Sequence, residues 1–404
     1  MLEEDTAPLT FRITRTIGEA LWRVGCPPFG LEPQLLLQRA RRQTGLHDFA
    51  ADHRFEQALL RLCISANNEA QLHFFGRMGI QSMFLSALRQ RLTWVQIQRK
   101  NPKVLRTPLL SPVLVVGFPR SGTTLLHRLL SLADDAKSLA AWEVQAPLAP
   151  LDRVDHRRKQ TVIQFRRIAQ LAPSLALKHP LHADSPEEDF WLLNASLLSP
   201  TFHIFAPLDS YEVWLEQQNM QEPYRLWASM LSSFQFASPK SRLTLKSPTH
   251  TAHVDSAVAA VPNLAIVHLH RDPVEVLGSL NSLIHTLYAL VSTRRNPKAL
   301  GRLNLHRLQR AQEKNCLARK NIATNILDVH YDELKSDPVG LVQRIHQHFD
   351  ITFQDSHALA IRQFMHDRPQ HAQGHHVYSL EECGLNEADV YRKLASTHHL
   401  KSVD

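Results

Sequence analysis

Apolar residues recur every three or four positions through the first hundred residues of the chain. The spacing holds from Phe55 to Lys100, and it holds again over residues 31–45, where Gly45 follows the last periodic position. This period places apolar side chains on one face of a helix, and a glycine just past the periodic stretch is typical of a helix end. The pattern predicts a helical N-terminal region over residues 1–105.

The pattern changes at Val113 into short apolar runs separated by longer helical stretches. Residues 101–112 contain three prolines and divide the two patterns. The strand candidates are residues 113–118, 242–248, 264–271 and 325–331, with 202–207 a weaker one. Strands that alternate with helices form parallel sheets covered on both faces. We therefore predict an α/β three-layer sandwich with a central parallel sheet over residues 106–350, followed by a helical closing segment over 351–404.

Composition and charge narrow the class of protein only partly. The 404 residues are 44% hydrophobic and 21% charged, as in an ordinary globular protein. The net charge of +8 suits an acidic small ligand, a nucleic acid or an anionic membrane equally. Basic and aromatic residues are not interleaved as in proteins that stack nucleic-acid bases, so we expect no nucleic-acid partner.

Cysteine usage and the chain start predict where the protein works. The four cysteines are far apart, which argues against a disulfide framework or a zinc site. The acidic N-terminus lacks an apolar signal core, and no apolar run approaches the length of a membrane span. We expect a cytoplasmic protein without a transmembrane segment, and we interpret the histidines of residues 371–376 as surface residues rather than metal ligands.

The segment from Gly117 to Gly122 is a glycine-bounded turn between a predicted strand and a predicted helix. Such a turn presents backbone N–H groups and the positive end of the helix dipole to an oxyanion. Its sequence adds hydroxyl donors and one guanidinium. These candidate anion ligands, with the glycine that permits the tight path, are Arg120, Ser121, Gly122, Thr123 and Thr124.

This loop departs from the nucleoside-triphosphate pattern G-x-x-x-x-G-K-[ST]. Thr123 stands where that pattern has its lysine, and Arg120 is the only cation in the loop. No acidic strand end follows that would hold magnesium. The loop therefore favours one phosphate plus one further small oxyanion over a triphosphate. The strand, glycine-bounded turn and helix are still those expected of a P-loop NTPase-like fold.

A second candidate anion site follows a later strand. Arg271 stands at the end of the strand candidate 264–271, and Ser279 lies eight residues further, about two helical turns into the next element. Together these two side chains could bind a separate phosphate. The alternative is a structural ion pair of Arg271, for instance with Asp272.

The two segments GFPRSGTT and HRDPVEVLGS together resemble the cofactor-binding segments of sulfotransferases that use 3′-phosphoadenosine 5′-phosphosulfate. The order of the two segments and the number of residues between them match those of that family. The segment VHYDELKSDP is similar to a third segment that the family shares. The segments LKSPTH and HHVYSLEECGL resemble the bacterial-type branch of that superfamily. The resemblance implies a P-loop core and an enzyme that transfers a sulfonate group to an acceptor, most simply a hydroxyl, without a metal.

The resemblance also implies roles for individual residues. The first segment would bind the 5′-phosphosulfate, Arg271 and Ser279 the 3′-phosphate, and Tyr331 would lie near the adenine. Arg120 and Lys246 are the candidates for stabilising the charge that develops during transfer.

The general base has two candidates. Glu143 falls 23 residues after Arg120, about where the tyrosylprotein branch of the superfamily has its glutamate base. His250 follows Lys246 by four residues, whereas the cytosolic branch has its histidine two residues on. Either side chain could instead be structural. We favour Glu143 narrowly, and we interpret His127, on the helix after the loop, as a packing residue.

Two further features leave alternatives open. Glu187, Glu188 and Asp189 suit the first turn of a helix as well as an acceptor site. The acceptor could be a small molecule or a polymer, and the oligomeric state is not predicted. A P-loop kinase or nucleotide hydrolase, and a nucleotide-binding relative without turnover, are the rival functions.

Overall fold

A computed structural model describes residues 16, 29–50, 52–149, 154–171, 182–294, 296–322, 325–367 and 380–394. In chain order its elements are α2 (Pro33–Thr44), α3 (His53–Asn68), α4 (Phe74–Lys100), η1 (Pro102–Leu105), β1 (Val113–Gly117), α5 (Thr123–Leu130), β2 (Ala136–Ser138), α6 (Ala141–Gln145), α7 (Arg157–Leu171), η2 (Asp189–Ser196), α9 (Thr201–Phe205), α10 (Asp209–Glu216), α11 (Gln221–Ala237), β3 (Arg242–Lys246), η3 (Pro248–His253), α12 (Val254–Ala260), β4 (Ala265–His270), α13 (Pro273–Ala289), α14 (Pro297–Ala318), η4 (Arg319–Asn321), β5 (Ile326–His330), α15 (Tyr331–Ser336), α16 (Pro338–His348), α17 (Asp355–His366), η6 (Glu381–Cys383) and α18 (Glu387–Leu394), where η marks a 3-10 helix.

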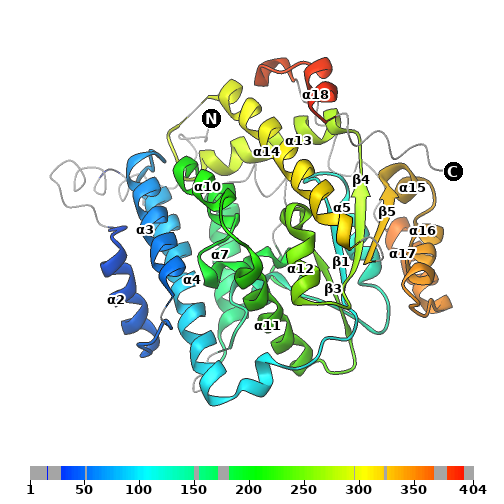
Figure 1. The fold of residues 1–404 in the computed structure, drawn as a ribbon, viewed down its shortest axis with the longest axis horizontal. Coiled ribbons are helices and arrows are strands. Elements are labelled where there is room, and N and C mark those ends of the chain that lie inside the picture. The colour runs from blue at the N-terminus through cyan, green and yellow to red at the C-terminus, as the bar shows by residue number, and fades with distance from the viewer. Residues whose placement is uncertain are drawn as a thin grey trace.

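The strands of the described chain form one parallel sheet in the order β2-β3-β1-β4-β5 (Figure 1). β1 is central and pairs with β3 and β4, with Val115 opposite both Lys246 and Val267. From β1 the chain forms β2 and β3 on one side and then β4 and β5 on the other, so the carboxyl end of β1 lies where the chain changes sides. Ligands of open α/β sheets bind at such a switch point.

Alternate residues of the central strand pack into different apolar clusters. Leu114 and Val116 belong to a large cluster with α2–α4, α11 and α12. Val113 and Val115 belong to a second cluster with α5, α16 and α17 on the other face. Figure 1 shows the blue N-terminal helices and the orange C-terminal helices on opposite sides of the sheet. The predicted three-layer α/β sandwich is confirmed.

The N-terminal helices share their core with the sheet. Leu62 of α3 and Phe84 of α4 lie in the same buried cluster as Leu114. Gly45 closes α2 with a left-handed φ of 72°, as the sequence predicted. The division of the chain at residues 105 and 350 stays a prediction. The histidines of residues 371–376 lie outside the described residues.

The four stronger strand candidates became β1, β3, β4 and β5, but the fifth was wrong. Residues 202–207 contribute to the short helix α9 instead. A short apolar run has no period that separates a strand from a buried helix, and Phe202 is fully buried among helices. β2, at the sheet edge, was not predicted because its three residues are mostly polar.

No helix among the described residues is long and apolar enough to cross a membrane.

Candidate active site

The loop after β1 follows a path that only glycine permits at two of its positions. Gly117 has a φ of 141° and Gly122 a φ of 100°. A Cβ on Gly122 would lie 2.7 Å from Cδ2 of Tyr331. Arg120 also has a positive φ, of 70°, which a residue with a side chain adopts at some cost in free energy. The loop is therefore fixed tightly against the segment that follows β5.

The loop residues offer hydrogen-bond donors to an anion. Ser121 is fully buried, and its Oγ has no hydrogen-bond partner among the described residues. Thr123 is buried, Thr124 is exposed, and both open α5, whose first N–H groups have no partner within the helix. An unpaired hydroxyl beside a helix N-terminus suits an oxyanion ligand. These residues fit the group that the sequence predicts.

The two predicted anion-binding segments meet in the structure. Arg120 Nε donates a hydrogen bond of 3.0 Å to Ser279 Oγ on α13. Arg271 donates through a terminal guanidinium nitrogen to the backbone carbonyl of Arg120 at 3.0 Å. Arg271 also lies over the ring of Tyr331, 4.2 Å from its centre, and donates to Glu275 at 2.8 Å. Arg271 pairs with Glu275 rather than with Asp272, the partner considered above.

Lys246 ends β3 and is almost completely buried, with 2% of its side chain exposed. Its Nζ donates a hydrogen bond of 2.7 Å to Glu188 Oε1. Ser247 Oγ donates to the other carboxylate oxygen of Glu188 at 3.2 Å. A buried ammonium requires such a partner because its desolvation is costly. Sequence reasoning had left Glu188 without a role.

His250 lies in a buried polar network. Its Nε2 is 2.9 Å from Asp189 Oδ2, and its Nδ1 is 2.6 Å from the hydroxyl of Tyr224. Trp227 donates to the same Asp189 oxygen at 2.7 Å. Burial raises the pKa of Asp189, but the contacts with His250 and Trp227 and a backbone hydrogen bond together outweigh it, so the net pKa is lowered. His250 is fully buried and both of its ring nitrogens have partners.

Glu143 lies on α6, beside the edge strand β2. Both of its carboxylate oxygens are 3.0 Å from Lys137 Nζ, and one accepts from the backbone N–H of Ala140 at 2.7 Å. The second contact is that of a helix-capping acid, the structural alternative considered for this residue. The side chain is 13% exposed.

His127 is fully buried on α5, and its Nε2 contacts the carbonyl oxygen of Thr244 at 3.0 Å. Burial, with the nearby charge of Lys246, lowers the pKa of His127 to about 4. This side chain is therefore neutral and packed inside the fold at ordinary pH.

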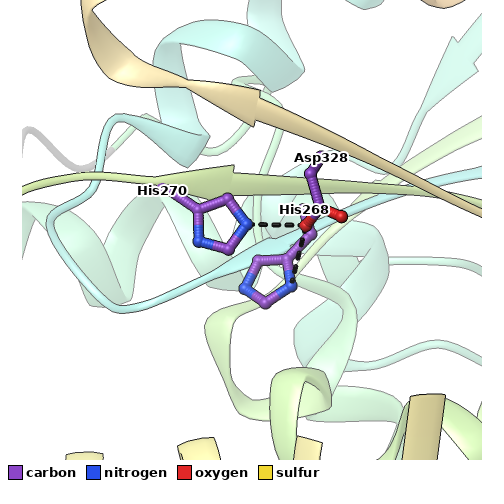
Figure 2. A group of neighbouring side chains, drawn as sticks. All are labelled: His268, His270 and Asp328. Carbon is purple, nitrogen blue, oxygen red and sulfur yellow. Dashed lines mark hydrogen bonds and ion pairs between the residues drawn. The ribbon is translucent and has the colours of Figure 1, made fainter. Parts of the chain in front are cut away.

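One group of three side chains among the described residues has the spacing of metal ligands: His268, His270 and Asp328 (Figure 2). His270 Nε2 is 2.6 Å from Asp328 Oδ1, and Arg319 donates to both carboxylate oxygens. Burial raises the pKa of Asp328, yet these hydrogen bonds outweigh it and the pKa is lowered. Because Asp328 already has a cationic partner, Arg319, we interpret these three side chains as a structural cluster. It joins β4 to β5 just before Arg271 in the chain.

Comparison with known proteins decides the family. A family model described as "Sulfotransferase family" matches residues 112–355, which is more than half of the chain. The chain belongs to the sulfotransferase family. The match contains the loop after β1, Lys246, Arg271 and Tyr331, so the resemblance drawn from the sequence is confirmed. The protein is a sulfotransferase, and not the kinase or hydrolase considered as its rival.

Three similar proteins come from mycobacteria. The omega-hydroxy-beta-dihydromenaquinone-9 sulfotransferase Stf3 of Mycobacterium bovis is 25% identical over 342 residues, which are 80% of this chain and 84% of Stf3. The crystal structure of sulfotransferase STF9 from Mycobacterium avium has a TM-score of 0.82 at 25% identity, over 92% of this chain and 97% of STF9. Sulfotransferase STF1 from Mycobacterium tuberculosis has a TM-score of 0.75 at 26% identity, over 90% and 98% of the two chains.

Proposed function

We propose that this sulfotransferase takes its sulfonate from 3′-phosphoadenosine 5′-phosphosulfate and transfers it to a hydroxyl group of an apolar small molecule. The observation that carries the proposal is the contact of Arg120 with Ser279 and Arg271. Two anion-binding segments meet there, as a donor with two separate phosphate positions requires. A nucleoside triphosphate carries all of its negative charge on one run of linked phosphates, so it would not need the second segment.

The residues divide between the two ends of the donor. Ser121, Thr123, Thr124 and the N–H groups around Gly122 would bind the 5′-phosphosulfate. Arg271 and Ser279 would bind the 3′-phosphate, and charge-assisted hydrogen bonds from an arginine suit that group. Tyr331, which stacks under Arg271, would contact the adenine.

The donor supplies an activated sulfonate with a phosphate leaving group. Transfer of this kind depends on positioning and on fixed positive charge. Arg120 and Lys246 carry that charge here. Lys246 is held on a strand, so its ammonium costs little reorganisation when charge develops. Glu143 and His250 stay the two predicted bases, and both are engaged by neighbours in the structure.

Apolar side chains beside the loop support an apolar acceptor. Phe118 follows β1 directly and is only partly buried, as are Ile204 and Phe205 in the same cluster. Trp191 lies 5.2 Å from Phe205 between ring centres. The relative Stf3 is named for a hydroxylated menaquinone, which is consistent with such a surface.

Product formation tests the proposal. The purified protein is incubated with the labelled donor and two sets of acceptors, long-chain alcohols and phenols on one side and sugars on the other. We expect labelled sulfate esters of the apolar set. Label transferred to the sugars alone would overturn the acceptor class, and hydrolysis of ATP with magnesium, without use of the phosphosulfate, would overturn the donor.

A further inference from the structure

Glu188 is the acidic side chain in direct contact with Lys246. Its two oxygens accept separately, one from Lys246 Nζ at 2.7 Å and the other from Ser247 Oγ at 3.2 Å. Each carboxylate oxygen can accept two hydrogen bonds, so both retain a site for another donor. These contacts orient the carboxylate without exhausting its capacity to accept.

The position of Glu188 in the fold is close to the loop after β1. Lys246 is the register partner of Val115, and Ser247 N–H donates to the Val115 carbonyl at 3.2 Å. β3 is therefore the strand next to β1. Glu188 is hydrogen-bonded to Lys246, the last residue of β3, and to Ser247, which follows it. Glu143 is instead bonded to Lys137 on β2, one strand further from β1.

Solvent access also favours Glu188. Its side chain is 22% exposed, whereas the Lys246 side chain is 2% exposed. The Glu188 side chain is therefore partly open to an external acceptor, whereas Asp189 is fully buried and hydrogen-bonded to His250. His250 is fully buried as well.

We infer that Glu188 is the general base of the transfer, an inference that rests on the proposed function. The acceptor oxygen attacks the sulfur and forms the new O–S bond. The bond between sulfur and the bridging phosphate oxygen breaks, and its electron pair leaves on the phosphate. The acceptor proton goes to the Glu188 carboxylate, and Lys246 and Ser247 hold that carboxylate in place.

The test compares two acceptors that differ in whether a proton must be removed. An aliphatic alcohol such as 1-octanol must lose its proton during attack, whereas 4-nitrophenol is already ionised at mildly alkaline pH. Glu188→Gln keeps the shape of the side chain and one acceptor oxygen. We expect it to lower turnover of 1-octanol at least about a hundredfold and turnover of 4-nitrophenol by less than about threefold. Transfer to water, measured as release of the adenosine bisphosphate without an added acceptor, should fall as with the alcohol.

Glu143→Gln is the rival variant. Glu222→Gln, which changes an exposed side chain paired with Arg225, is the control for loss of a negative charge. If Glu143→Gln lowers turnover of the alcohol and of water but not of 4-nitrophenol, then Glu143 is the base and the inference is overturned. An equal loss for both acceptors in Glu188→Gln would make Glu188 a positioning residue of Lys246, which also overturns it.

Binding of 3′,5′-adenosine bisphosphate gives a measurement independent of turnover. We expect Glu188→Gln to bind it as tightly as the unchanged protein, within about twofold, because a base does not contact the nucleotide. If the unchanged protein does not bind the bisphosphate, the proposed function fails. If it binds and Glu188→Gln turns over the alcohol at full rate, the function stands and only the assignment of the base fails.

Discussion

Arg120 Nε donates a hydrogen bond of 3.0 Å to Ser279 Oγ across 159 residues of sequence. The backbone carbonyl of Arg120 accepts a second bond from Arg271. The chain's own side chains and backbone thus join the loop after β1 to the first turns of α13. A site assembled in this way loses little conformational freedom on binding, which favours affinity.

Replacing Arg271 tests the second anion site. Arg271→Ala should weaken binding of 3′,5′-adenosine bisphosphate by about 2 kcal/mol, or roughly thirtyfold, because charge-assisted phosphate contacts are lost. Calorimetric titration measures the change. Arg344→Ala is the control, since Arg344 forms a surface ion pair with Glu333. Equal affinity of the Arg271 variant and the unchanged protein would remove Arg271 from the site.

Glu275 competes with a phosphate for Arg271. Its carboxylate accepts from Arg271 Nε at 2.8 Å and is exposed. Exposed pairs of this spacing are weak, about 0.5 kcal/mol or less. Glu275→Gln should therefore tighten bisphosphate binding by about twofold, with a larger gain at low salt, where repulsion of the phosphate by Glu275 is less screened. Weaker binding in this variant would mean that Glu275 holds Arg271 in its binding position.

Gly122 tests the packing of the loop against Tyr331. Gly122→Ala would bring a Cβ within 2.7 Å of the Tyr331 ring at a φ of 100°. We expect loss of at least about tenfold in bisphosphate affinity, because loop and ring must move apart. Gly79→Ala is the matched control, since nothing lies within 4 Å of its added Cβ. A Gly122 variant that binds like the control would contradict the packing.

The buried histidine His127 predicts a pH dependence of stability. Burial, with the charge of Lys246, lowers its pKa from 6.5 to about 4 in the folded protein. The unfolded chain therefore binds a proton between these values and the folded protein does not. Stability should fall as the pH drops from 6.5 toward 4, by on the order of 3 kcal/mol from this group.

Urea unfolding across this pH range measures the effect. His127→Gln keeps a polar atom near the Thr244 carbonyl but cannot be protonated, so its stability should fall less steeply with acid. His366→Gln, which changes a side chain that is 85% exposed, should leave the slope as it is. If the free energy of unfolding falls equally with acid in the His127→Gln variant and in the unchanged protein, the lowered pKa of His127 is contradicted.

The sequence predicted the segments of the site better than the contacts between them. The strand-turn-helix at Gly117–Gly122 and the spacing of Arg271 and Ser279 have local signals, because glycine placement and helical period depend on neighbours in the chain. The partner of Lys246 has no such signal. Glu188 lies 58 residues earlier in the chain, and tertiary contacts such as the hydrogen bond of 3.1 Å from the Lys246 backbone N–H to Asp189 bring the two together.

The same limit explains the misread elements. Residues 202–207 are apolar enough for a strand, but residues 202–205 lie in the helix α9, where Phe202 is buried among helices. His250 has a plausible spacing from Lys246, but its partners Asp189 and Tyr224 come from other segments. Local pattern therefore indicated which residues are candidates, whereas tertiary contacts decide which of them an acceptor can reach.

Calorimetric titration with 3′,5′-adenosine bisphosphate, beside ATP with magnesium, tests the central claim most directly. The two anion-binding segments at Arg120 and Arg271 predict tight binding of the bisphosphate and no measurable binding of ATP. Tight binding of ATP with no binding of the bisphosphate would contradict the account, because the second phosphate position would then not exist.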